Sequence, residues 1–230
     1  MTGFCQIWWG TLAMVRDRHL DLLSGAERAR RSALRRPEGR ERFTVAAVLL
    51  RLAVGARTGQ AADAVGIVRS CPDCDRPHGK PTLADHSLEV SVSHAGERVV
   101  VALTDAGPVG VDVERLDRAG HLAGMDRRVY SPAESVHPST DPTRDFYTCW
   151  TRKESVLKAT GDGLRVPMPT LTLAAADQPA RLLAFADRPD LVDTCTVRDL
   201  NPGSGYVAAV TVLAAGPLHV AESSAVHLLT

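Results

Sequence analysis

The chain has 230 residues, of which 44% are hydrophobic and 23% are charged, a balance typical of one globular domain or two small ones sharing a core. Its 27 Lys and Arg residues equal its 27 Asp and Glu residues, so the whole molecule has no field that would favour nucleic acid. No apolar run approaches the ~20 residues that span a bilayer. The N-terminus lacks the basic region of a signal peptide. We therefore expect a cytoplasmic protein that binds neither membrane nor nucleic acid.

The first half of the chain is predicted to contain one strand, two helices and several further strands. Residues 4–9 form a short strand, and Ser24-Gly-Ala-Glu27 is a capping box that opens a basic helix ending near Pro37. A second helix is predicted over about 38–55, where apolar residues recur at helical spacing. Strand patterns follow at 88–92, 98–104 and 109–113.

The turn at 105–108 divides the chain into two predicted halves, 1–107 and 108–230. The second half contains another capping box at Ser131-Pro-Ala-Glu134 and a long helix entered at Asp141-Pro142. Strands are expected at about 170–174, 193–199 and 205–214. Each half combines helices with a small sheet, so the fold class is predicted to be α+β.

Arginines gather along the first predicted helix and the start of the second: Arg28, Arg30, Arg31, Arg35, Arg36, Arg40 and Arg42. A local basic face on a neutral protein suits a small polyanion, although a solvated helix face is the more common explanation of a charge run. The five cysteines are scattered and odd in number, so we expect free thiols. Cys71-Pro-Asp-Cys74 and His78 have a zinc-like spacing, but no second ligand pair follows, which favours a plain loop.

Two carboxylates lie in the segment Gly110-Val-Asp-Val-Glu114. Side chains alternate along a strand, so Asp112 and Glu114 share one face while the valines can enter the core. Neighbouring carboxylates repel unless a cation lies between them, and oxygen ligands together with substrate phosphates suit Mg²⁺. The alternative is an edge strand with a solvated acidic face.

The long helix in the second half places Glu154 and Lys158 one turn apart, beside Trp150. This pair could hold a metal and a phosphate, or it could be an ordinary ion pair on a solvated helix. Ser93 and His94 follow a strand and could donate hydrogen bonds to phosphate oxygens, or could simply lie at the surface. No nucleophile elbow is present, so a Ser/His hydrolase is poorly supported.

Together and in this order, these elements resemble the phosphopantetheinyl transferase superfamily, in particular its longer, surfactin-type branch. The resemblance covers roughly residues 20–215 and rests on the segments Gly79-Lys80-Pro81, Ser93-His94, Gly110–Glu114, Tyr130–Glu134 and Trp150–Glu154 with Lys158 and Gly161. It implies two similar α/β halves related by a pseudo-twofold axis, with coenzyme A in the cleft between them. The N-terminal half would face the 3′-phosphate and adenine, and the C-terminal half would carry the metal and catalytic motifs.

The resemblance also implies a set of site residues. Mg²⁺ would be bound by Asp112, Glu114 and Glu154, with Glu114 acting directly or through water. Coenzyme A would be contacted by the following residues: Arg30, Arg36, Arg42, Lys80, Ser93, His94 and Lys158.

The implied reaction moves 4′-phosphopantetheine from coenzyme A to a serine of an apo acyl or peptidyl carrier protein and releases 3′,5′-ADP. Glu154 would act as the base and Lys158 would assist the leaving group. A monomer that serves secondary metabolism is expected by analogy. The alternatives are a metal-dependent phosphohydrolase, which would need no protein acceptor, and a coenzyme A-binding module without catalysis.

Overall fold

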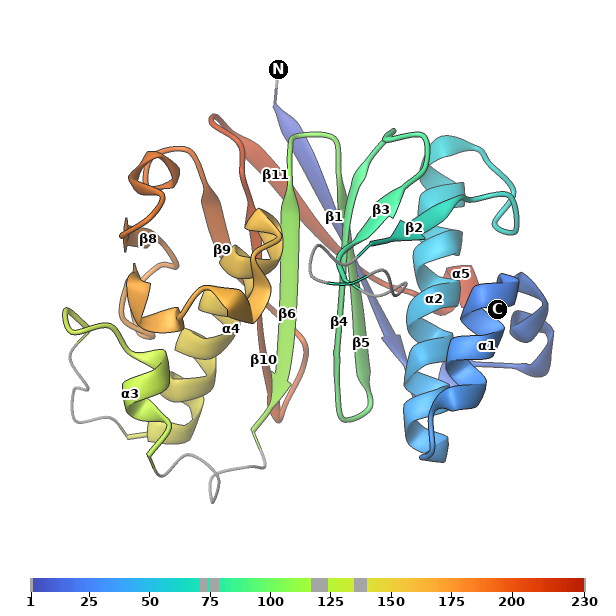
Figure 1. Ribbon diagram of the computed structural model, residues 1–230, viewed down its shortest axis with the longest axis horizontal. Coiled ribbons are helices and arrows are strands. Elements are labelled where there is room, and N and C mark those ends of the chain that lie inside the picture. The colour runs from blue at the N-terminus through green and yellow to red at the C-terminus, as the bar shows by residue number, and fades with distance from the viewer. Residues whose placement is uncertain (1, 71–73, 75–78, 117–123, 135–139, 230) are drawn as a thin grey trace.

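The computed structural model of the chain describes residues 2–70, 74, 79–116, 124–134 and 140–229. Two β-sheets stand side by side at its centre, with the long helix α4 on one of them and the long helix α2 on the other (Figure 1). The predicted mixed α+β class is confirmed. In the described part of the chain, no helix is both long enough and apolar enough to cross a bilayer.

The first sheet has the strand order β11-β1-β5-β4, and the second has the order β6-β10-β9. Neighbouring strands are antiparallel except β1 and β11, which are parallel. The strands of these sheets are β1 (Gly3–Thr11), β4 (Glu89–Ala95), β5 (Arg98–Thr104), β6 (Val109–Arg115), β9 (Thr196–Leu200), β10 (Tyr206–Val212) and β11 (Leu218–Ser224). Two small ribbons pair β2 (Ile67–Arg69) with β3 (Pro81–Leu83), and β7 (Leu171–Leu173) with β8 (Leu182–Phe185).

The α-helices are α1 (Gly25–Ala33), α2 (Pro37–Thr58), α3 (Asp126–Val129), α4 (Pro142–Thr160) and α5 (Val226–Leu229). The capping box at Ser24 is confirmed, with Ser24 accepting from the Glu27 amide and Glu27 reaching back to the Ser24 amide. Helix α1 ends at Ala33 and not near Pro37, because the chain must extend before the proline that opens α2. Helices α2 and α4 both end at glycines in the left-handed region, Gly59 and Gly161.

One prediction needs correction, and several strands were not predicted. The capping box at Ser131 is only half formed: Glu134 accepts from the Ser131 amide, but residues 132–134 form a turn, and the Ser131 hydroxyl bonds Thr172 instead. Strand β11 was not foreseen, and it returns residues 218–224 of the C-terminal half to the sheet of the N-terminal half. The short strands β2, β3 and β8 were also missed. The predicted Cys71–Lys80 loop lies largely outside the described residues.

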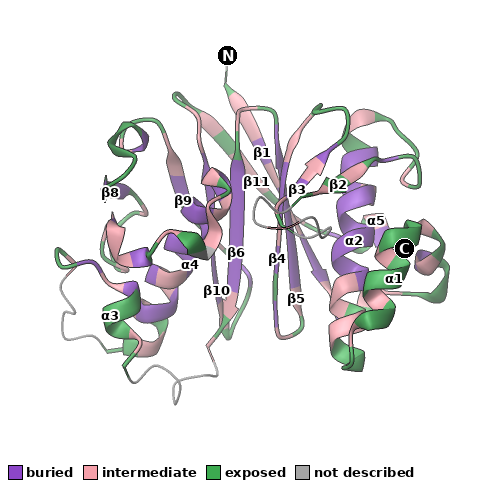
Figure 2. Cartoon of the chain, in the orientation of Figure 1, coloured by how far each residue is buried: buried purple, intermediate pink, exposed green. Residues whose placement is uncertain are grey.

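Among the described residues, the three largest of four hydrophobic clusters hold the two sheets and their helices together. One lies between α2 and the first sheet, and another lies beneath α4 in the second half. The third cluster joins the sheets, since Ile7 and Val100 of the first pack with Val111 and Val210 of the second. Strands β5 and β6 are therefore almost wholly buried, as Figure 2 shows. This shared core fixes β4 and β6 as neighbours at the boundary between the sheets.

Candidate active site

The site forms where β4 and β6 meet, at the outermost strand of each sheet. Both strands are described throughout, and no backbone ladder joins them. The edge of β6 is instead satisfied by side chains at Val111. Its amide donates to Ser91 Oγ at 3.0 Å, and its carbonyl accepts from Lys158 Nζ at 3.1 Å. We call this boundary between β4 and β6 the seam.

Asp112 lies at the centre of the seam and is only 4% exposed. Its Oδ1 accepts from Ser93 Oγ at 2.8 Å and from Lys158 Nζ at 2.6 Å. Its Oδ2 is buried and has no hydrogen-bond partner among the described residues. A buried carboxylate oxygen without a partner is costly, so this atom is where a cation or a ligand donor would be stabilising.

Lys158 is the second member of the group. Its ammonium contacts Ser93 Oγ at 3.0 Å as well as Asp112 and the Val111 carbonyl, while its side chain remains 29% exposed. Three fixed acceptors aim the ammonium, and the remaining exposure leaves it accessible to a phosphate oxygen. The structure thus brings Ser93, Asp112 and Lys158 together from three separate elements.

Glu154 lies one turn before Lys158 on α4 and is 9% exposed. Burial raises the pKa of this carboxyl, the negative charge of Asp112 raises it further, and the ammonium of Lys158 offsets part of the rise. The two carboxylates thus share one low-dielectric region.

This raised pKa predicts how Glu154 affects stability when no metal is bound. A group whose folded-state pKa is raised stabilises the fold at low pH, and that contribution is lost as the pH rises from the ordinary value of 4.5 through the raised value. In Glu154→Gln the side chain cannot ionise, so the variant does not lose this stability as the pH rises. In EDTA at neutral pH we expect the variant to melt about 2–4 °C above the wild type by calorimetry. The difference should vanish as the pH falls toward 4.5.

The same substitution at the exposed Glu97 serves as the control and should leave the melting temperature unchanged. A Glu154→Gln protein that melts below the wild type at neutral pH would contradict a destabilising buried charge at Glu154.

Gly110 lets helix α4 approach β6 this closely. A Cβ atom at this position would overlap backbone atoms of Ser155, Lys158 and Ala159 on α4. Helix and strand therefore touch through their main chains, and this contact holds Glu154 and Lys158 beside Asp112. The glycine was recognised as part of an acidic motif, but its packing role was not predicted.

Two charged residues that precede Glu154 on α4 are fully buried, which the sequence did not reveal. Lys153 Nζ contacts Glu134 Oε2 at 2.5 Å and the carbonyls of Val129 and Leu171 at 2.6 and 2.8 Å. Arg152 pairs with Asp199 at 2.6 Å. These pairs fix the rotation of α4 about its axis. A single sequence holds no signal for them, because charged helix residues normally face solvent.

Lys80 and His94 also lie close to the seam. Lys80 Nζ donates to the carbonyl of Ala159 at the end of α4 and lies 3.7 Å from Glu89, and burial lowers its pKa. Partial burial lowers the pKa of His94, and the positive charges of Arg42 and Lys158 add to the effect. His94 alternates with Ser93 along β4 and keeps solvent access.

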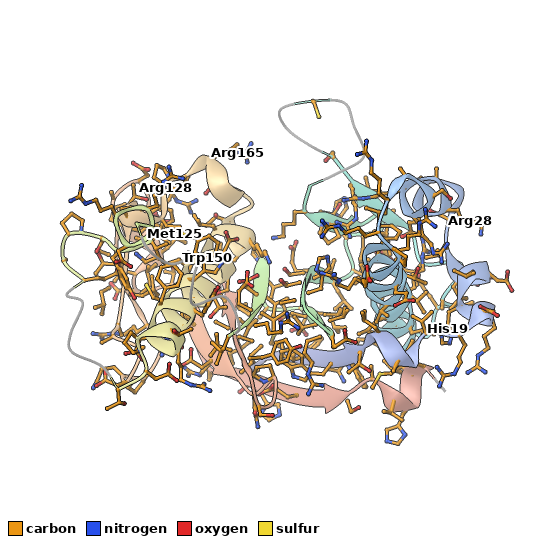
Figure 3. The ribbon with its side chains drawn as sticks, turned by 90° about the horizontal axis from the view of Figure 1, so that it is seen from below. His19, Arg28, Met125, Arg128, Trp150 and Arg165 are labelled. Carbon is orange, nitrogen blue, oxygen red and sulfur yellow. The ribbon has the colours of Figure 1, made fainter. Side chains whose placement is uncertain are left out.

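The remaining predicted residues are more dispersed. Arg30 on α1 lies over the ring of Phe43 at 5.6 Å, and Arg36 is exposed at the start of α2. In Figure 3, Arg28 lies on the α2 side of the molecule, far from Trp150 and Met125 on the α4 side. The Trp150 ring stacks on Phe146 in the second-half core. Binding of the 3′-phosphate by Arg30, Arg36 and Arg42 stays a prediction.

Within the described part of the chain, no three His, Cys, Asp or Glu side chains form a ready metal-binding group. The set Asp112, Glu114 and Glu154 is therefore not preassembled, and its role stays a prediction. A cavity of about 430 Å³ lies elsewhere, beside the β9–β10 loop, lined by Arg144, Asp199 and Tyr206 among others. The acidic and basic groups converge at the seam and not at this cavity.

Several known proteins that resemble this chain are named 4′-phosphopantetheinyl transferases. Residues 108–211 match the sequence model of the 4′-phosphopantetheinyl transferase superfamily. A 4′-phosphopantetheinyl transferase of Bacillus subtilis is 27% identical over 199 residues, which are 84% of this chain and 84% of the relative. The 4′-phosphopantetheinyl transferase HetI of a Nostoc species is 29% identical over 202 residues, 84% of this chain and 80% of the relative. The 4′-phosphopantetheinyl transferase Sfp of Bacillus subtilis is 26% identical over 138 residues, 58% of this chain and 59% of the relative.

Asp112, Glu154 and Lys158 of the seam all lie within the segment that matches the 4′-phosphopantetheinyl transferase superfamily. The chain is therefore similar to this superfamily over residues 108–211 and to named transferases over most of its length, and it is an enzyme of the phosphopantetheinyl transferase class. The predicted resemblance and enzyme class are thereby confirmed.

Proposed function

We propose that the protein transfers 4′-phosphopantetheine from coenzyme A to a serine of an apo acyl or peptidyl carrier protein, with Mg²⁺, and releases 3′,5′-ADP. The observation that chiefly supports this reaction is the group of Ser93, Asp112 and Lys158 at the seam, where Asp112 Oδ2 has no hydrogen-bond partner in the described part of the chain. This group contains the fixed ammonium and the unsatisfied carboxylate that handling of a pyrophosphate requires.

The residues at the seam fit a hard divalent cation. Among the described residues Asp112 Oδ2 has no hydrogen-bond partner, and Glu154 is a second buried carboxylate, close enough that the charge of Asp112 raises its pKa. These two would hold Mg²⁺, and Glu114 on the same face of β6 would do so directly or through water. When bound, Mg²⁺ supplies positive charge against the pyrophosphate oxygens and the departing 3′,5′-ADP.

Glu154 is the base in this proposal. A carrier serine is a weak nucleophile until its proton is removed, and a carboxylate with a raised pKa is better suited to accept that proton at neutral pH. The serine oxygen forms a bond to the β-phosphorus, which carries the pantetheine arm, while the bond from that phosphorus to 3′,5′-ADP breaks. Lys158 donates hydrogen bonds to the phosphate oxygens that gain charge.

Coenzyme A would lie across the seam, between the half that carries α2 and the half that carries α4. Lys80, Ser93, His94 and Arg42 would face its phosphates, with Arg30 and Arg36 toward the 3′-phosphate. The positive charges of Arg42 and Lys158 both lower the pKa of His94, which supports an electropositive region there. A pseudo-twofold relation of the halves, a monomeric state, a cytoplasmic location and a role in secondary metabolism belong to this proposal as predictions.

The test is to incubate the protein with coenzyme A, Mg²⁺ and several apo carrier proteins of different origin, and then to measure the intact mass of each carrier. We expect a gain of one phosphopantetheine on at least one carrier, and no gain when its acceptor serine is replaced by alanine. An unchanged mass on every carrier would exclude the proposed transfer and would favour a phosphohydrolase or a non-catalytic coenzyme A-binding module.

A further inference from the structure

The seam contains a buried serine that neither the predicted site nor the superfamily match assigns a role. We infer that Ser91 is a positioning residue, whose hydroxyl holds the backbone of β6 so that Asp112 and Lys158 meet. The inference rests on the proposed function, since it concerns the residues proposed to act in transfer. Ser91 is only 3% exposed, and its partner Val111 is fully buried.

Ser91 and Ser93 are two residues apart on β4, so their side chains leave the strand on the same face. Both reach across the seam to β6. Ser91 Oγ accepts from the main-chain amide of Val111, and Ser93 Oγ donates to the side chain of Asp112. The pair therefore fixes the main chain and the side chain of consecutive residues, which is what orienting one carboxylate requires.

The contact matters because β6 is the outer strand of its sheet. The edge of β6 at Val111 that faces β4 has no strand paired with it in the described part of the chain. In the antiparallel pair of β6 and β10, alternate residues direct both backbone groups away from the neighbouring strand. The amide of Val111 is directed this way, and Ser91 is its hydrogen-bond partner. Without a hydroxyl at position 91, a buried donor would be left unpaired, and β6 would shift to satisfy it.

The other backbone group of Val111 connects this contact to the chemistry. Its carbonyl accepts from Lys158 Nζ at 3.1 Å, and the same ammonium lies 2.6 Å from Asp112 Oδ1. The carbonyl of Val111 belongs to the peptide unit that leads to Asp112. A shift of β6 would therefore move two of the three acceptors of Lys158 at once.

The experiment compares Ser91→Ala with Ser91→Thr, which keeps the hydroxyl, and with Ser131→Ala as a matched control. Ser131 is also a buried serine whose hydroxyl forms a hydrogen bond, to Thr172 at 2.9 Å, but this partner lies on β7 and not on a strand of the seam. For Ser91→Ala we expect about a tenfold fall in kcat at an almost unchanged KM for coenzyme A. Ser91→Thr should regain most of that loss, and Ser131→Ala should keep kcat within about twofold of the wild type.

Hydrogen exchange at the Val111 amide gives a second readout that needs no turnover. We expect Ser91→Ala to lose protection there, while Ser131→Ala and Ser91→Thr keep it. If Ser91→Ala does not fold, Ser91→Cys replaces it, since a thiol keeps the size but is a weak acceptor. It should show the same losses of kcat and protection to a smaller degree.

An unchanged kcat together with unchanged exchange at Val111 would overturn the inference. An equal loss of kcat in Ser131→Ala would do so as well, because it would show a general effect of lost stability. Failure of the proposed function itself looks different, since the wild type would then modify no carrier. In that case protection of the Val111 amide alone decides whether Ser91 holds β6.

Discussion

Asp112→Asn should lower the rate of carrier modification by roughly 10³-fold while leaving the protein folded. The substitution removes the negative charge that pairs with Lys158 and replaces one carboxylate oxygen by an amide group that cannot bind a cation. The rate should be measured as holo-carrier formed per unit time, by mass spectrometry, at saturating coenzyme A and Mg²⁺. Far-ultraviolet circular dichroism reports whether the fold is kept.

Asp141→Asn is the matched control for this experiment. Asp141 is exposed and caps α4 through the Arg144 amide, a role that asparagine fills equally well. We expect its rate to stay within about twofold of the wild type. A rate for Asp112→Asn that matches that of the control would remove Asp112 from the chemistry.

Gly110→Ala should have the largest effect on stability. The added methyl group would overlap main-chain atoms of α4, which cannot move aside as a flexible side chain could. We expect a loss of about 3 kcal/mol or more in the free energy of unfolding, a fall in melting temperature of ~6–12 °C, and loss of transfer as α4 moves away from β6. Urea denaturation and the carrier assay measure the two effects.

Gly39→Ala separates this packing effect from a general effect of losing a glycine. Gly39 lies in the first turns of α2, and an added Cβ there meets no atom within 4 Å. Alanine at that position should be neutral or stabilising by ~0.4–1 kcal/mol. Gly110→Ala protein as stable as Gly39→Ala protein would show that α4 does not rest on the backbone of β6.

The parts of the site that the sequence predicted are those with a local pattern. The alternation of Asp112 and Glu114 along a strand, and the one-turn spacing of Glu154 and Lys158 on a helix, follow from periodicity alone. Their convergence did not follow from periodicity, and it was expected only from the resemblance to a family. The structure adds that Lys158 bonds Asp112 and Ser93 directly.

The parts that the sequence could not predict depend on distant partners. Strand β11 pairs with β1 over more than 200 residues of chain, for example Leu218 with Gly3, and its half-exposed residues lack a clear alternation. Lys153 resembles any helical lysine until Glu134 and three carbonyl groups are seen around it. The role of Ser91 became visible only when its hydroxyl was found to accept from the Val111 amide, which faces away from the neighbouring strand β10.

The central claim is that the groups at the seam carry out a transfer and not a hydrolysis. One measurement distinguishes the two: the amounts of 3′,5′-ADP and of holo-carrier formed by the same sample of wild-type protein with coenzyme A, Mg²⁺ and an apo carrier. Transfer predicts equal amounts of both products throughout the reaction, and neither product when the carrier is left out. Nucleotide released from coenzyme A without a matching amount of holo-carrier would contradict the proposed function.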